Sequence, residues 1–214
     1  MSEVTSSGFT QPSLGTGPAP VRTGLLAGRD FLEVRFGGTG AQGVILMGVV
    51  LAMAATRDHR YVTQTQTYGL EESDGCGHSD VIISDRPVDY PELQSADLLV
   101  ALSQDAVDDY SYLLRPDGIL IFDSDTVAEL PPFAGGGFGI PFTRLALEAT
   151  GRTEGTSDAL TLGAVVAITG VVSVESLRKA LASTASGGSE EVNDKALARG
   201  LALDQAEWRR SGAC

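Results

Sequence analysis

Residues 31–55 read FLEVRFGGTGAQGVILMGVVLAMAA and contain the clearest fold signal in the chain. The segment Phe31–Phe36 alternates apolar and charged side chains and is rich in strand formers. A glycine-rich stretch, Gly37–Gly43, comes next, and the apolar run Val44–Ala55 that follows predicts a buried helix. A glycine loop between a strand and a helix exposes backbone N–H groups at the helix start, where anions bind.

Further strands and helices are expected to alternate along the chain. Strands are predicted at residues 60–67, 80–84, 97–102, 119–123 and, as a short edge strand, 139–143. Helices are predicted at residues 104–113, from 144, at 156–171, at 174–182 after an N-cap at Ser173, and at 193–210 after an N-cap at Asn193. A turn is predicted at residues 115–118. This order predicts an α/β domain over residues 31–210 with a mostly parallel sheet, after a flexible arm over residues 1–30.

The amino-acid composition argues against several classes of protein and of metal site. The chain has 214 residues and a formal net charge of −13, which argues against non-specific nucleic-acid binding. Its two cysteines, Cys76 and Cys214, exclude a disulfide framework and an iron–sulfur cluster held by four thiolates of this chain. The longest apolar run is too short to span a membrane. Because the first residues lack a signal-peptide pattern, we expect a cytoplasmic protein.

Several polar residues are candidates for binding or catalysis. The segment Thr63–Gly69 ends a predicted strand with hydroxyl and amide groups, and it is either a ligand contact or a solvated edge strand. Cys76 and His78 lie in a predicted polar loop, where a nucleophile with its base is the alternative to a loop without function. Acidic side chains at a helix start and a strand end are weaker candidates for hydroxyl or metal contacts: Asp105, Asp108, Asp109, Asp123 and Asp125.

The glycine stretch also fits the dinucleotide-binding pattern G-x-G-x-x-G over Gly38–Gly43. That pattern requires an acidic residue at the end of the second strand. Asp58 precedes the second strand, and Glu71 and Glu72 lie beyond its end. Three interpretations therefore stay open for these glycines: a tight turn, a phosphate ligand other than a dinucleotide, and NAD(P).

Four blocks of sequence resemble one known family when they are taken in order. The first three are residues 36–43, residues 65–84 with Glu71, and residues 96–104 followed by Gly118 and Asp123. The fourth comprises Ile140–Phe142, Leu162–Gly163 and Asn193–Gly200, and the likeness extends from about residue 31 to residue 205. In this order the blocks resemble the gamma subunit of 2-oxoacid:acceptor (ferredoxin) oxidoreductases. The resemblance implies a Rossmann-like fold and a role within a heteromeric complex that oxidatively decarboxylates a 2-oxoacid to an acyl-CoA.

The family resemblance also implies cofactors and partners. Thiamine diphosphate, Mg²⁺ and [4Fe–4S] clusters are expected in alpha, beta and delta-type partner subunits, and ferredoxin or a similar protein accepts the electrons. The gamma subunit is expected to help bind coenzyme A and to close the active site, without a catalytic residue or metal ligand of its own. The expected contacts are Gly37, Gly38, Thr39, Gly40, Ala41, Gln42, Gly43, Thr67, Tyr68, Gly69, Ser103 and Gln104. The alternative is a stand-alone NAD(P)- or CoA-binding Rossmann-type protein.

The chain departs from the family pattern at four positions. Leu70, Ser73 and Asp74 stand where the family usually has proline, arginine and glycine. Asp158 stands where the family usually has asparagine. A basic side chain is therefore missing, and two acidic side chains are added.

Overall fold

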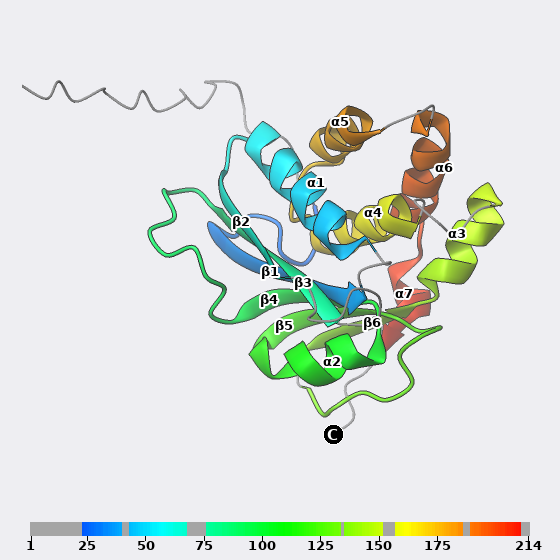
Figure 1. The fold of residues 1–214 in the computed structure, drawn as a ribbon, viewed down its shortest axis with the longest axis horizontal. Coiled ribbons are helices and arrows are strands. Elements are labelled where there is room, and N and C mark those ends of the chain that lie inside the picture. Colours follow the sequence, from blue (N-terminus) through cyan, green and yellow to red (C-terminus); the bar gives the residue numbers. More distant parts are fainter. Residues whose placement is uncertain are drawn as a thin grey trace, which may run out of the picture.

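The computed structural model describes residues 23–39, 43–67, 76–133, 135–151, 157–185 and 189–210. These residues form one seven-stranded sheet with helices on both faces, and the strand order is β2-β3-β1-β4-β5-β6-β7 (Figure 1). The strands are β1 Phe31–Thr39, β2 Tyr61–Thr67, β3 Cys76–Ser84, β4 Ala96–Ala101, β5 Leu114–Asp123, β6 Gly136–Ile140 and β7 Arg209–Arg210. The helices are α1 Val44–Arg57, α2 Gln104–Tyr110, α3 Phe142–Thr150, α4 Ser157–Thr169, α5 Val174–Thr184, α6 Glu190–Leu201 and α7 Gln205–Trp208, with a 3₁₀ turn η2 at Ser111–Leu113.

The direction of the strands confirms a mostly parallel sheet. Strands β1, β4, β5 and β6 pair in parallel, in that order. Strand β3 is antiparallel to both β1 and β2, so β2 runs in the same direction as β1. Strand β7 is antiparallel to β6. Within the described sheet, only β3 and β7 run against the other strands, and the predicted α/β class is confirmed.

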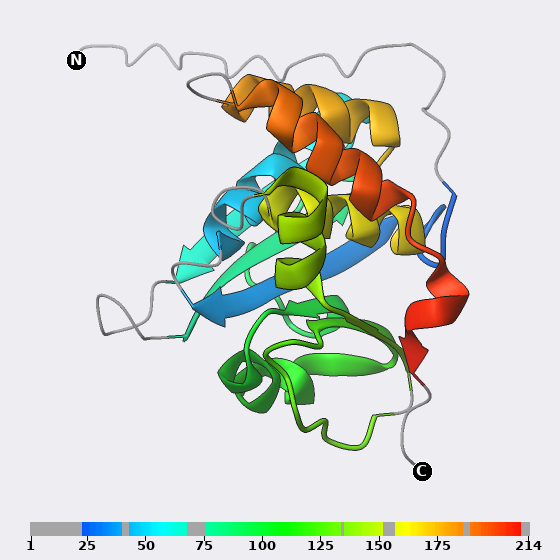
Figure 2. The ribbon, with the colours of Figure 1, turned by 90° about the vertical axis from the view of Figure 1, so that its right-hand side faces the viewer.

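The sheet has one strongly apolar face and one smaller core on the opposite face. Leu32, Val34 and Phe36 of β1 pack with buried side chains of α1, α4 and α5 in the larger core. Leu99 and Phe122 belong to the smaller core, which α2 covers. Figures 1 and 2 show α1, α4, α5 and α6 layered over the first face and α2 on the other. Among the described residues, no helix is long and apolar enough to cross a membrane.

Two local predictions are confirmed in detail. The apolar run after the glycine stretch forms α1, which begins at Val44 as predicted and ends two residues beyond Ala55. Ser173 is the N-cap of α5, since its side chain accepts a hydrogen bond from the Ser176 N–H group. The buried carboxylate of Asp58, at the end of α1, accepts further bonds from the Ser173 N–H and O–H groups at 2.6 and 2.7 Å. This contact ties the end of α1 to the start of α5.

The boundaries of β3 and β5 correct the sequence prediction. Cys76 and His78 lie in β3 and not in a loop, because Cys76 pairs with Thr39 of β1, and His78 pairs with Thr67 of β2. The turn predicted at residues 115–118 lies within β5, where the register with β4 shifts.

The strand predicted at residues 139–143 is also displaced. Strand β6 begins earlier and ends before Pro141, which has no N–H group for a sheet hydrogen bond. It is not an edge strand, because β7 pairs with its outer side.

The last predicted helix is divided in two. Asn193 lies inside α6, which begins one turn earlier, after Ser189, with Glu190 and Glu191 in its first turn. The helix ends at Leu201, and Asp204 starts α7 by accepting the Ala206 N–H bond. The final arginines then pair with β6, so a continuous helix to residue 210 was wrong.

The arm expected over residues 1–30 is described only from residue 23 onward, and that part packs into the domain. Leu26 is buried in the larger core. The N–H groups of Leu25 and Leu26 donate to the carbonyls of Ile168 and Thr169 at 3.0 and 2.7 Å. Arg29 Nη1 lies 2.7 Å from Asp97 Oδ1. The folded domain therefore includes residues that precede the predicted boundary at residue 31.

Candidate cofactor-binding edge

The structure brings the described parts of three predicted binding segments to one edge of the sheet. Gly37 of β1 pairs with Ala101 of β4 on one side and with His78 of β3 on the other. Thr67, the last residue of β2, pairs with the far side of His78. Ser103 follows β4 at the same edge. Ligands in open α/β sheets bind at the carboxyl ends of the strands, and this edge is therefore the candidate site.

The binding segments differ from prediction in two respects. Strand β3 separates β1 from β2, although the two strands predicted at residues 31–36 and 60–67 are consecutive in sequence. Gly37, Gly38 and Thr39 belong to β1 and not to a loop. Five further predicted contacts lie outside the described residues: Gly40, Ala41, Gln42, Tyr68 and Gly69.

Gly43, immediately before α1, meets an acidic side chain from a distant helix. Its φ of 66° lies in the left-handed region that glycine adopts without strain. A Cβ atom at Gly43 would lie 2.3 Å from Oδ2 and 2.5 Å from Oδ1 of Asp158, in the first turn of α4. The carboxylate therefore packs against the backbone at the amino end of α1, which carries a partial positive charge.

Gly37 also has a close neighbour, on the α2 face. A Cβ atom there would lie 2.7 Å from Cδ2 of Tyr110, so the phenol ring packs directly on the backbone of β1. The Arg35 guanidinium lies over this ring, with 4.9 Å between Cζ and the ring centroid. His78 Nδ1 lies 3.3 Å from the Tyr110 hydroxyl oxygen. Tyr110 therefore joins α2 to both β1 and β3.

A buried ion pair completes this cluster. Arg35 Nε and Nη2 each donate to one carboxylate oxygen of Asp80 at 2.6 Å, a bidentate arrangement. The two side chains are 10% and 7% exposed. Sequence analysis missed this cluster, although Arg35 alternates with apolar residues and Asp80 lies two residues beyond His78. Those spacings place the three side chains on one face of the sheet once the register is known.

Three titratable groups around this ion pair, Cys76, His78 and Tyr110, have pKa values shifted toward their uncharged forms. Burial raises the pKa of the Cys76 thiol. Burial, with the nearby Arg35 charge, lowers the pKa of His78. Burial and the hydrogen bond with Cys76 raise the pKa of Tyr110. A protonated thiol is a poor nucleophile, so the raised thiol pKa argues against Cys76 as an activated nucleophile with His78 as its base.

Ser103 and Gln104 use their side chains within the chain. Ser103 Oγ accepts the Ala106 N–H bond at 3.2 Å as the N-cap of α2. Gln104 Oε1 accepts the N–H groups of Ala128 and Glu129, each at 3.0 Å. Gln104 therefore holds the segment after β5 against the start of α2.

The acidic candidates do not form a metal site in the described part of the chain. Asp123 accepts the Asp125 N–H bond at 2.9 Å, and burial raises the pKa of Asp123. Asp105 lies in the first turn of α2, where it complements the helix dipole. No group of three or more His, Cys, Asp or Glu side chains able to hold a metal occurs among the described residues.

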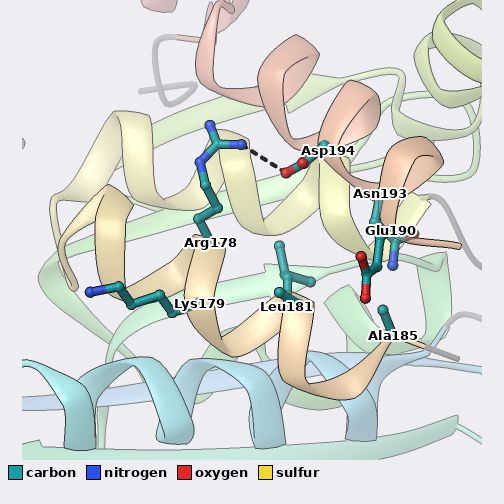
Figure 3. A pocket seen from close by; sticks show the side chains of 8 residues that line it. Arg178, Lys179, Leu181, Ala185, Glu190, Asn193 and Asp194 are labelled. Carbon is teal, nitrogen blue, oxygen red and sulfur yellow. Dashed lines mark hydrogen bonds and ion pairs between the residues drawn. The ribbon is translucent and has the colours of Figure 1, made fainter.

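A cavity of about 300 Å³ lies away from this edge, between α5 and α6. Figure 3 shows Leu181 and Ala185 along it and the Arg178–Asp194 ion pair beside it. None of the predicted contact residues lines this cavity.

Comparison with known proteins identifies the family. A model of the pyruvate ferredoxin/flavodoxin oxidoreductase family matches residues 33–203. The chain is 39% identical over 171 residues to the 2-oxoglutarate synthase subunit KorC of Methanocaldococcus jannaschii, covering 78% of this chain and 91% of that protein. It is 34% identical over 188 residues to the ketoisovalerate oxidoreductase subunit VorA of Methanothermobacter marburgensis, covering 85% of this chain but 37% of that longer protein.

A solved structure agrees with the sequence matches. The gamma subunit of a keto/oxoacid ferredoxin oxidoreductase from Geobacter sulfurreducens PCA superimposes with a TM-score of 0.75 at 39% identity. The match covers 84% of this chain and 99% of that one. The family expected from the sequence blocks is therefore confirmed. The chain belongs to the pyruvate ferredoxin/flavodoxin oxidoreductase family, and it corresponds to the gamma subunits of these enzyme complexes.

Proposed function

We propose that this chain is the gamma subunit of a complex that oxidatively decarboxylates a 2-oxoacid to an acyl-CoA and passes the electrons to ferredoxin or a similar acceptor. Family membership carries this proposal. 2-Oxoglutarate is the first substrate to test, because the M. jannaschii relative is named a 2-oxoglutarate synthase subunit. A branched-chain 2-oxoacid is the second, because of the ketoisovalerate relative.

The redox cofactors belong, in this proposal, to partner subunits of alpha, beta and delta type. Four thiolates are needed for a [4Fe–4S] cluster, and Cys76 is the single cysteine among the described residues. The described residues also lack a carboxylate and histidine cluster for Mg²⁺. The residues that the structure describes therefore do not fit thiamine diphosphate with its Mg²⁺, or the iron–sulfur clusters.

Within the complex, the proposed task of this chain is to help bind coenzyme A and to close the active site. The contacts we propose are the glycine stretch Gly37–Gly43, Thr67–Gly69 and the pair Ser103–Gln104. The convergence of Gly37, Thr67 and Ser103 at one sheet edge supports this proposal. A stand-alone NAD(P) enzyme has less support, because an antiparallel strand separates β1 from β2 and no acidic residue ends β2.

The test of the complex is affinity purification of the tagged chain under native conditions. We expect larger partner subunits, thiamine diphosphate and the broad visible absorption of iron–sulfur clusters to purify with it. The complex should then reduce a viologen dye with 2-oxoglutarate, and the rate should depend on coenzyme A. A colourless chain that purifies without partners would overturn the proposal.

The test of the glycine stretch is Gly40→Asp in the purified complex. A carboxylate near a bound phosphate should raise the KM for coenzyme A by roughly tenfold, with a smaller effect on the KM for the 2-oxoacid. Ala182→Asp adds the same charge at an exposed position of α5 and is the control. An unchanged KM for coenzyme A in an intact complex would remove the glycine stretch from the binding site.

A further inference from the structure

An apolar pocket opens on the α2 side of the sheet. It has a volume of about 200 Å³, and none of the proposed coenzyme A contacts lines it. Leu120 belongs to the smaller core, and Leu114 and Phe133 pack against that core. Figure 1 shows α2 on this side of the sheet and α1 and α4 on the other. We call this opening the Tyr112 pocket, and its apolar lining residues are Tyr112, Leu114, Leu120, Pro131, Pro132 and Phe133.

The aromatic ring at the mouth of the pocket faces water. Tyr112 is 79% exposed, more than any other large apolar side chain that the structure describes. Leu130, next to the two prolines, is 36% exposed. Exposed apolar side chains around a pocket mark a surface that another molecule covers, and Tyr is enriched among the residues that dominate such contacts.

Negative charge surrounds the pocket. Residues 97–140 contain eight acidic side chains and one basic side chain, a net charge of −7 within a chain of −13. The basic one, Arg115, is bonded to the buried carboxylate of Glu33. Asp117 and Asp125 pair with arginines of other segments. Six of the acidic side chains are exposed, and they are Asp105, Asp108, Asp109, Asp117, Asp125 and Glu129.

A side-chain amide holds two of these acidic residues together beside the pocket. Gln104 Nε2 donates to Asp108 Oδ1 at 2.9 Å and to the Glu129 carbonyl at 3.0 Å. The segment that follows Glu129 enters the lining of the pocket, and Asp109 lies about one turn before Tyr112. The ion pairs of the described residues include none of these three acids. Their charges are therefore available to a partner.

We propose that the Tyr112 pocket and the acids beside it form the docking surface for a basic segment of a partner subunit. An apolar side chain of that segment enters the pocket, and its flanking Lys or Arg side chains pair with Asp108, Asp109 and Glu129. Charge complementarity selects this occupant, because the same acids repel a nucleic acid, an anionic membrane surface and a second copy of this acidic chain. The inference rests on the proposed function only in that the chain is a subunit, and it does not require coenzyme A.

The first test compares amide hydrogen exchange in the full chain alone and in the purified complex. A docked segment covers residues 111–114 and 128–133, so we expect exchange there to slow by at least about fivefold on assembly. Unchanged exchange at both segments in an intact complex would overturn the inference, because the surface would then be free.

The second test measures the chemistry of the surface without partner subunits. The probe is a synthetic pentapeptide with one phenylalanine between two pairs of lysines, titrated into the full chain. We expect Asp108→Lys/Asp109→Lys and Tyr112→Ser each to raise the Kd by at least about fivefold, and only the charge effect should fade at high salt. The control, Asp89→Lys/Glu92→Lys, makes the same charge change at exposed positions between β3 and β4, and its Kd should stay near that of the unmodified chain.

The two tests separate failure of the inference from failure of the proposed function. If the chain purifies without partner subunits, the proposed function fails, while a peptide Kd that depends on Tyr112 and on the two aspartates still supports the docking surface. A Kd that is equal in the unmodified chain and in both pocket variants, or that rises as much in the control, would overturn the inference.

Discussion

The two faces of the sheet are buried by different means. The face under α1, α4 and α5 is a continuous apolar core, to which β1 contributes Leu32, Val34 and Phe36. On the opposite face the same strand presents Glu33 and Arg35, and both are almost fully buried. Alternate residues of β1 thus lie in an apolar layer on one face of the sheet and in a layer of charged side chains, the ionic layer, on the other. Strand β1 is therefore buried by paired charges on the α2 face, beside the smaller apolar core, and by close apolar packing on the α1 face.

The ionic layer extends across four strands, β3, β1, β4 and β5. Glu33 Oε2 accepts from Arg115 Nη2 at 2.8 Å, and the Glu33 N–H group donates to Asp97 at 2.9 Å. Arg29 Nη1 forms an ion pair with Asp97 Oδ1 at 2.7 Å. With the Arg35–Asp80 pair, each buried acid of this layer has a basic partner, as burial of charge requires. Removing one partner is therefore more damaging than removing both.

The largest effect should come from breaking the most buried pair. Arg35→Met leaves the Asp80 carboxylate buried without its two hydrogen bonds from Arg35. We expect the free energy of unfolding to fall by about 3 kcal/mol, since an unpaired buried charge costs about 3–5 kcal/mol. Urea denaturation of the chain measures this loss.

The double variant Arg35→Met/Asp80→Leu separates charge from packing. It removes both charges and keeps similar side-chain volumes, so most of the lost stability should return. If the double variant is as unstable as Arg35→Met, the ionic face depends on packing in the same way as the apolar face. The proposed difference between the two faces would then be wrong.

The next largest loss of stability should come from a cavity in the core on the apolar face. Leu51 of α1 is 0% exposed within the larger core. Leu51→Ala should lower the free energy of unfolding by about 2–3 kcal/mol, because it leaves a cavity in a packed layer. Leu51→Met, which nearly conserves volume, is the control and should cost less than about 1.5 kcal/mol. Equal losses in the two variants would mean that the layer is not closely packed around this position.

The apolar face was largely predictable from sequence, and the ionic face was not. Alternation in Phe31–Phe36 and the apolar run Val44–Ala55 predict a strand and a helix that bury their apolar sides against each other. Arg35 and Asp80 are 45 residues apart, and only the register of β1 with β3 makes them partners. A charged residue between apolar ones usually indicates an exposed position, so the pattern alone indicates solvent where the structure has a buried pair.

The candidate edge was predictable in its location but not in its chemistry. The carboxyl ends of strands that run in one direction meet at one edge, which is why Gly37, Thr67 and Ser103 converge there. Two features of the edge could be seen only in the tertiary structure. The Gln104 side-chain amide accepts a hydrogen bond from the segment after β5, and the Asp158 side chain of α4 packs against Gly43. Neither contact follows from local sequence, because each joins separate segments.

A smaller effect should come from the link between the ionic face and α2. Tyr110→Phe keeps the ring over Gly37 and Arg35 but removes the hydroxyl that contacts His78. We expect a loss of about 1 kcal/mol, the usual net contribution of one hydrogen bond. Thermal unfolding, with Tyr112→Phe at a 79% exposed position as the control, measures the difference. A loss as large as that of Arg35→Met would indicate that the ring has moved.

The smallest expected effect is a pH dependence of stability that comes from His78, beside the ionic layer. Burial and the Arg35 charge lower the pKa of His78 below its ordinary value of 6.5, against the opposing influence of Asp80. As the pH falls below 6.5, the unfolded chain therefore binds a proton at this residue before the folded chain does, and stability decreases with falling pH. His78→Gln removes this proton uptake, so the variant should lose less stability than the unmodified chain between pH 7.5 and pH 5.5. Urea denaturation at both pH values measures the pH dependence of stability in the two proteins. Identical slopes would mean that His78 titrates alike in the folded and unfolded chains, which would contradict the prediction.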